Sequence, residues 1–124
     1  MVTLVEVLTG EKAAGRIASA NQFNDPPPEE HEYLLFYARV ELAALPHNTR
    51  DSVSEYDFSL VDASGRVWNP PSIVDPKPQL QGSGFSGAVI EGWGTHVRRM
   101  GEPVHLVFEL SWDGTDGLWF EIPE

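Results

Sequence analysis

Three carboxylates and one imidazole follow one another in Glu29, Glu30, His31 and Glu32. Carboxylates beside a histidine are the groups that general acid–base catalysis uses. This cluster, however, follows three consecutive prolines at the start of an apolar run, where charged side chains are ordinarily solvated. We therefore expect a solvated strand entrance here, and no catalytic residues.

Metal ligands are the next chemistry to consider. The four histidines lie in separate segments, without the close spacing that brings two imidazoles onto one zinc ion; they are His31, His47, His96 and His105. Residues 113–117, Asp-Gly-Thr-Asp-Gly, offer oxygen ligands but lack the acidic spacing of a calcium loop, so a hairpin turn is predicted. The chain has no cysteine, which excludes thiolate zinc sites and disulfides. We expect no metal, no cofactor and no enzymatic activity.

Nucleophilic and phosphate-binding motifs also fail on spacing. Residues 82–87, Gly-Ser-Gly-Phe-Ser-Gly, miss the Gly-x-Ser-x-Gly pattern of a nucleophile elbow. They also lack the lysine of a phosphate-binding loop. The glycines instead predict a strand with bulges or a close backbone approach.

The four tryptophans are the most informative residues that remain. Exposed aromatic side chains stack on sugars or anchor a protein partner. Trp119 is predicted on the strand face opposite Leu118 and Phe120, and Trp93 follows a glycine at the end of a strand. Trp93 and Trp119 are therefore the candidate ligand-binding residues. The alternative is that the tryptophans cover sheet edges or pack under proline-rich loops.

Alternating apolar residues predict the strands that must position these side chains. The clearest strand spans residues 31–42, with a core face of Leu34, Phe36, Ala38, Val40 and Leu42 and an opposite face that grades from aromatic to charged. The other predicted strands are residues 2–8, 56–61, 66–68, 82–93, 106–111 and 118–122. Residues 62–65, Asp-Ala-Ser-Gly, are predicted to be the turn of a hairpin between strands 56–61 and 66–68. Helical spacing predicts a short helix over residues 11–21, with Thr9 as N-cap. The predicted loops are residues 25–30, 45–54, 69–78 and 94–103.

This order of elements predicts one all-β domain over residues 1–124. The length suits one hydrophobic core. About seven strands without regular intervening helices favour a sandwich or barrel over a parallel sheet with crossover helices. The proline-rich segment 69–78 is predicted to cross from one sheet to the other.

The chain resembles a bacterial family of immunoglobulin-like, telokin-like domains of unknown function, found on secreted proteins and lipoproteins. The matching residues are 33–42, then 58–65 (Phe-Ser-Leu-Val-Asp-Ala-Ser-Gly), then 82–90 before a late strand pair. The resemblance covers about residues 32–122. It implies an immunoglobulin-like antiparallel β-sandwich at the cell surface that serves in binding or assembly, with no catalytic residues. The start of this sequence lacks the signal peptide and lipid-accepting cysteine of exported members.

Charge narrows the class of partner. Eight Lys and Arg against nineteen Asp and Glu give a net charge of -11, which repels nucleic acid and anionic lipid surfaces. No segment approaches the roughly 20 apolar residues of a membrane span. The leading hypothesis is a non-enzymatic binding module of a secreted or surface protein, with a protein or glycan partner. The alternative is a structural domain that self-associates through strand edges.

Overall fold

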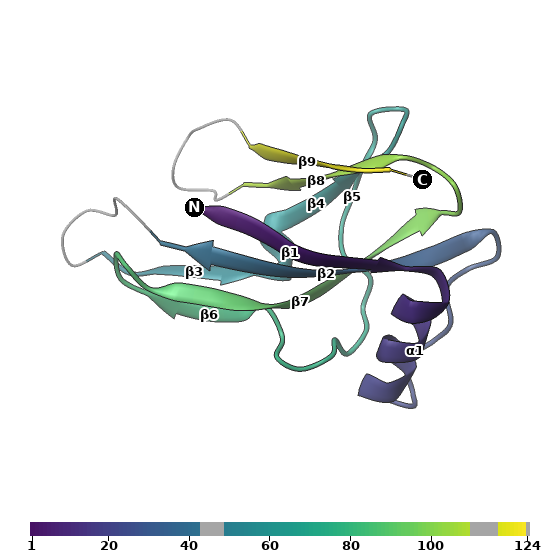
Figure 1. Cartoon of the computed structure of the whole chain (residues 1–124), viewed down its shortest axis with the longest axis horizontal. Coiled ribbons are helices and arrows are strands. Elements are labelled where there is room, and N and C mark those ends of the chain that lie inside the picture. Colours follow the sequence, from purple (N-terminus) through teal and green to yellow (C-terminus); the bar gives the residue numbers. More distant parts are fainter. Residues whose placement is uncertain (43–48, 110–116, 124) are drawn as a thin grey trace.

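The computed structural model describes residues 1–42, 49–109 and 117–123, and these ranges are mostly β-structure with one α-helix (Figure 1). The elements are β1 Val2–Thr9, α1 Gly10–Ala20, β2 His31–Glu41, β3 Asp51–Ser54, the 3-10 helix η1 Glu55–Asp57, β4 Phe58–Val61, β5 Val67–Trp68, β6 Gln81–Gly84, β7 Val89–Arg99, β8 Val104–Phe108 and β9 Leu118–Ile122.

The long strand β2 lies at the centre of a three-stranded antiparallel sheet of order β1-β2-β7. It pairs with β7 along its whole length, from His31 opposite Arg99 to Glu41 opposite Val89. Its other side pairs with β1, in which a bulge shifts the register between Leu4 and Glu6. The β-branched and aromatic content of β2 suits this central position.

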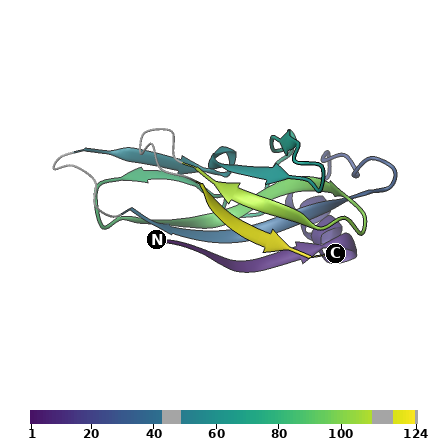
Figure 2. The same ribbon diagram turned by 90° about the horizontal axis from the view of Figure 1, so that it is seen from above.

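A second antiparallel sheet has the order β5-β4-β8-β9, and β3 and β6 form a separate two-stranded ladder. Figure 2 shows the strands seen from above, with the helix at the end of the molecule away from the N-terminus. The hydrophobic core contains residues from β2 and β7 together with residues from β4, β8 and β9. The two larger sheets therefore face each other across this core.

The predicted core face of β2 is confirmed. Its five apolar residues, Leu34, Phe36, Ala38, Val40 and Leu42, are all at most 2% exposed. Phe36 packs against Phe58 of the opposite sheet, with 4.9 Å between ring centroids. Period-2 alternation was enough to identify these residues because a buried strand face must be apolar.

The opposite face of β2 carries a second, smaller core under the helix. Ala13 and Ile17 of α1 pack there with Tyr33, Leu35 and Trp93. The predicted helix is present and spans Gly10–Ala20 instead of residues 11–21. Thr9 occupies the N-cap position in extended conformation, but its side chain makes no capping hydrogen bond. Farther along this face of the strand Arg39 is exposed. The predicted gradation from aromatic to charged residues therefore follows the change from the helix-covered part of the face to solvent.

Two predicted segments differ near η1. Residues 51–54 of the predicted polar loop form β3, which pairs with β6. Tyr56 was predicted to begin a strand, but it lies in a capped 3-10 turn and is exposed. The Ser54 side chain accepts the Tyr56 N–H, and the Asp57 carboxylate accepts the Ser54 N–H, so this capping box delays the strand to Phe58.

The largest error concerns residues 94–103, which were predicted to be a loop. The strand β7 continues through Gly92 and Gly94 to Arg99. A Cβ at Gly92 would lie 2.5 Å from the backbone of Gln79 and Leu80, and a Cβ at Gly94 would collide with the Phe36 ring. These glycines are therefore required for close packing and do not end the strand.

Candidate functional site

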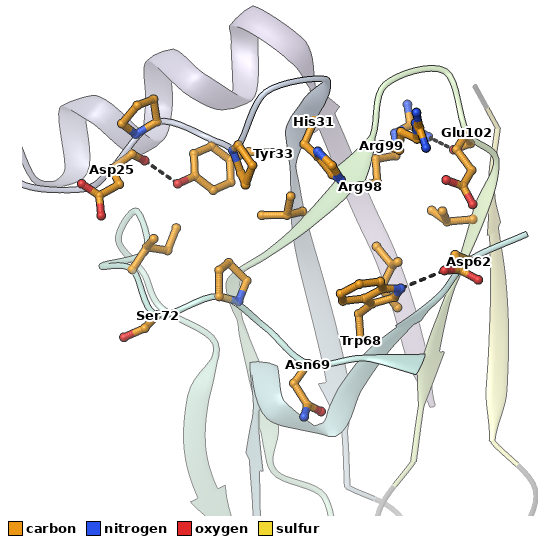
Figure 3. A pocket seen from close by; sticks show the side chains of 17 residues that line it. Asp25, His31, Tyr33, Asp62, Trp68, Asn69, Ser72, Arg98, Arg99 and Glu102 are labelled. Atoms are coloured by element: carbon orange, nitrogen blue, oxygen red, sulfur yellow. Dashed lines mark hydrogen bonds between the residues drawn. The ribbon is translucent and has the colours of Figure 1, made fainter. Parts of the chain in front are cut away.

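A cleft of about 630 Å³ opens beside the ends of β2, β5 and β7 (Figure 3). This volume lies within the usual range for ligand sites in proteins, roughly 300–1,000 Å³. The cleft is walled by two proline-rich segments, with Pro26 and Pro28 before β2 and Pro71 after β5. Two segments predicted as loops, residues 25–30 and 69–78, thus line the candidate site.

Trp68 lines this cleft and is 43% exposed. Its indole Nε1–H donates to Asp62 Oδ2 at 2.9 Å. The guanidinium of Arg66 lies over its ring, 4.1 Å from the centroid. Arg66 does not line the cleft, so the other ring face is the one available to a ligand. Trp68 is held in position before any ligand arrives.

Asp62 organises the turn between β4 and β5. Its Oδ1 accepts hydrogen bonds from the Ser64 hydroxyl at 2.6 Å and from the backbone N–H groups of Ser64 and Arg66. The hydrogen bonds from Ser64 and Trp68 lower the pKa of Asp62 to about 2. The carboxylate therefore stays ionised and acts as a fixed acceptor.

The opposite wall is formed by the start of β2 and the segment before it. The Tyr33 hydroxyl donates to the Asp25 backbone oxygen. Burial and the charge of Asp25 raise the pKa of Tyr33. Because Tyr33 is only 4% exposed and the Trp68 Nε1–H already has a partner, the Trp68 ring is the aromatic surface that these two residues offer in the cleft.

Arginines at the end of β7 already have carboxylate partners. Arg98 donates from Nε to Glu32 Oε1 at 2.9 Å and from Nη1 to the Pro123 carbonyl at 2.6 Å, and it is buried. Arg99 donates to Glu30 Oε2 at 3.3 Å. The carboxylates of Asp25 and Glu102 also line the cleft. A ligand therefore meets anionic groups without a partnering side-chain cation.

A second polar cluster lies in the interior, behind the loop from Asn69 to Leu80. Glu55 and Asp75 are each only 4% exposed. Thr95 Oγ1 donates to Asp75 Oδ1 at 2.7 Å. Burial, and then the adjacent Asp75 carboxyl, raise the pKa of Glu55 to about 9. The neighbouring Asp75 carboxyl favours the protonated form of Glu55. The Oδ2 atom of Asp75 has no hydrogen-bond partner among the described residues.

His96 occupies a position that sequence spacing did not identify. It is fully buried, Nε2 lies 3.0 Å from the Phe58 carbonyl oxygen, and the ring stacks on Phe36. Burial lowers its pKa to about 4, so the ring is neutral at ordinary pH. Among the described residues, no group of three or more histidine or acidic side chains could hold a metal ion. His47 and residues 113–116 of the acidic loop lie outside the described residues.

The two tryptophans predicted as ligand contacts lie in different environments. Trp93 is only 5% exposed and packs under α1, with Arg16 over its ring, so the structure places it in the interior, and its role in binding stays a prediction. Trp119 is 58% exposed and lies edge-on to His105, and its role in binding stays a prediction. Neither residue lines the cleft.

Sequence reasoning missed Trp68 as a site residue. A signal was present, because the predicted hairpin brings Asp62 of its turn close to Trp68 of its second strand, and two prolines follow after Asn69. The pairing of Glu55 with Asp75 had no such local signal, since loop residues 20 apart meet only after the sheets assemble.

Comparisons with known proteins give one structural likeness. No protein-family model matches the chain, and no curated protein matches it. Among solved structures, the chain is similar to a protein from Bacillus subtilis described as a "putative lipoprotein (ycdA)", with a TM-score of 0.71 and 14% sequence identity. The match covers 98% of this chain and 35% of that chain, so this chain spans about a third of its length. At this identity the likeness concerns the fold.

The structure and the comparison together agree with the coarser predictions. The described residues are mostly β, with antiparallel sheets and one helix. The structural neighbour is described as a lipoprotein, which is the kind of protein on which the resembling family occurs. Among the described residues, no helix has the length and apolar character to cross a membrane.

Proposed function

We propose that this chain is a non-enzymatic binding module of a bacterial secreted or surface protein and that it holds its ligand in the cleft beside Trp68. The observation that carries the proposal is the fixed indole of Trp68, whose Nε1–H donates to Asp62 and whose ring is covered on one face by Arg66. A rigid aromatic side chain in a concave site binds with little loss of conformational entropy.

Other features support binding in preference to catalysis. Asp62 is ionised and accepts the hydrogen bonds of its turn. Both arginines of the cleft, Arg98 and Arg99, form ion pairs with carboxylates. The buried acid Glu55 does not line the cleft. The polar groups near the cleft thus maintain its shape, as expected of a preformed binding site.

We assign the fold, as part of this proposal, to the immunoglobulin-like antiparallel β-sandwiches. Two antiparallel sheets that share one core support the assignment, together with the motif resemblance at residues 33–42 and 58–65. A location outside the cell rests on that resemblance and on the lipoprotein description of the Bacillus subtilis structural neighbour.

A ligand screen with two matched tryptophan variants tests the proposal. The wild-type protein would be screened against glycans, peptides and envelope extracts by thermal shift and by NMR. Trp68→Ala should abolish the shifts that a cleft ligand causes, whereas Trp119→Ala should leave them unchanged because Trp119 lies on β9 outside the cleft. Ligands whose binding depends on Trp119 and is indifferent to Trp68 would refute the cleft as the binding site.

Self-association through strand edges is the second candidate. The exposed Leu118 and Trp119 of β9, at one edge of the four-stranded sheet, favour it. The bulge in β1 and the charge of Glu6 disfavour pairing at the corresponding edge of the other sheet. Light scattering over a concentration series tests self-association, since a monomer at every concentration excludes it.

A further inference from the structure

The outer edge of β7 is covered unevenly along its length. β7 is the last strand in the order β1-β2-β7, so one side of its backbone faces away from β2. At Trp93 this side is occupied, since Trp93 N–H donates to the Pro78 oxygen at 2.8 Å and Leu80 N–H donates to the Trp93 oxygen at 3.0 Å. The segment before β6 therefore covers this part of the edge.

The next residues of β7 have their main-chain groups on the same side. In an antiparallel ladder, alternate residues point their N–H and C=O groups to the same side. Since those of Trp93 point away from β2, those of Thr95 and Val97 do too. The Thr95 N–H meets the carboxyl of Glu55. The Val97 N–H and C=O have no main-chain partner among the described residues.

This open part of the β7 edge lies in the cleft. Val97 and Arg99 line it together with Tyr33 and Trp68. Figure 3 shows Tyr33 and Trp68 on different walls of the cleft. An added strand would satisfy the free main-chain groups of Val97. Its successive side chains would point alternately towards the Tyr33 side and the Trp68 side.

The charge of the cleft selects among peptides. Asp25 and Glu102 line it, whereas the arginines there are already paired with Glu30 and Glu32. The whole chain carries a net charge of -11, which attracts cations over a longer range. A basic peptide is therefore complementary, and an acidic one is repelled.

We propose that the free edge of β7 at Val97 binds an extended, basic peptide segment of a partner protein by strand addition, with alternate apolar side chains against the exposed ring of Trp68. Main-chain hydrogen bonds provide the general affinity in such complexes, and pockets for alternate side chains provide selectivity. This inference rests on the proposed function, because it names the ligand of the same cleft.

The first test uses chemically modified peptides and the unaltered protein. The probes are labelled hexapeptides with lysine at both ends and Val, Ile, Thr, Tyr or Phe at the four central positions, measured by fluorescence anisotropy. Two versions of the best binder would be N-methylated at alternate amides, in complementary registers. Methylation in one register should weaken binding roughly tenfold or more, and methylation in the other should have little effect, because only alternate amides face β7. Equal effects in both registers would overturn strand addition.

The second test alters the edge of β7 itself. Val97→Pro removes the outward N–H and no hydrogen bond to β2, and Val97→Ala is the matched control that keeps the N–H. We expect roughly tenfold weaker peptide binding for Val97→Pro relative to Val97→Ala, with both variants folded by circular dichroism. If Val97→Pro does not fold, the methylated peptides alone decide the question.

Charge and competing occupants provide the remaining outcomes. Replacing the terminal lysines by glutamate should abolish binding, and added salt should weaken the lysine peptides. Absence of binding by any lysine peptide at millimolar concentration would overturn the inference. A glycan whose binding depends on Trp68 would then leave the proposed function intact, whereas no Trp68-dependent ligand of any class would remove both. A wild-type dimer that Val97→Pro converts to monomer would assign the edge to a second copy of the chain and overturn the peptide proposal.

Discussion

The segment that joins β5 to β6 lines the cleft, and two carboxyl groups hold it at different points. Asp62 binds Trp68 just before the segment, and Glu55 lies against Asp75 within it. The two carboxyl groups differ in protonation state. Asp62 is half-buried at the surface, with a pKa lowered to about 2, and accepts hydrogen bonds from Ser64, Arg66 and Trp68 as an anion. Glu55 is buried against Asp75, with a pKa raised to about 9.

The pKa values of Asp62 and Glu55 differ because the two carboxyl groups differ in solvent exposure and in the number of hydrogen-bond donors around them. Four donors surround the Asp62 carboxylate at the surface, so its charge is compensated. In the interior, two carboxyls share a few donors, and burial penalises a second charge. The surface contact should therefore persist over almost the whole pH range, whereas the interior contact should weaken as the solution becomes alkaline.

The largest expected loss of stability comes from adding a methyl group at Gly94, which packs against Phe36 and Glu55. A Cβ at Gly94 would collide with the Phe36 ring and approach Glu55 Cβ to 3.0 Å. We expect Gly94→Ala to lower the free energy of unfolding by about 3 kcal/mol, measured by urea denaturation. Gly65→Ala is the control in the Asp62 turn, where φ is +87° but the space is open. It should cost about 1 kcal/mol, and equal losses would contradict the contrast in packing.

Substitution of Glu55 by glutamine tests the interior acid pair directly. The folded-state pKa of about 9 lies above the ordinary value of 4.5, so the folded protein keeps a proton that the unfolded chain releases between these values. The stability from this group is complete below the ordinary value and is lost as the pH rises through about 9. Glu55→Gln supplies an uncharged donor at every pH. We expect it to remove most of the alkaline fall and to stabilise the protein by about 2 kcal/mol near pH 8.5.

The measurement for Glu55→Gln is the free energy of unfolding as a function of pH. Glu121→Gln is the matched control, because Glu121 is exposed on β9. It should reproduce the wild-type pH profile. An unchanged alkaline slope in Glu55→Gln would show that the proton is not held at this pair.

The two contacts also differ in how far sequence could predict them. Alternation identified Leu34 and Phe36 as core, and the Asp62 to Gly65 turn was visible in the residues because turn chemistry is local. The meeting of Glu55, Asp75 and Thr95 depends on three separate segments, and no short-range pattern specifies it. The glycines of β7 were misleading for the same reason, since Gln79, Leu80 and Phe36 approach them from elsewhere in the chain.

The smallest effect on stability, and the most local one, is expected from substitutions of Asp62. Its Oδ1 accepts the hydrogen bonds of the turn, whereas its Oδ2 accepts the Trp68 Nε1–H. Asp62→Asn keeps the first oxygen and replaces the second by an amide donor, so the turn should persist while Trp68 loses its partner. Asp62→Ala should disturb both.

NMR of the Trp68 indole N–H distinguishes these outcomes. Both variants should show faster exchange of this proton with water, and only Asp62→Ala should shift the Ser64 and Arg66 backbone amides strongly. Because the pKa of Asp62 is lowered to about 2, the wild-type indole signal should stay protected down to about pH 3. A protected indole in Asp62→Asn would show that Arg66 and the cleft walls alone hold the Trp68 ring. Asp62 would then stabilise only the turn between β4 and β5, and not the position of Trp68.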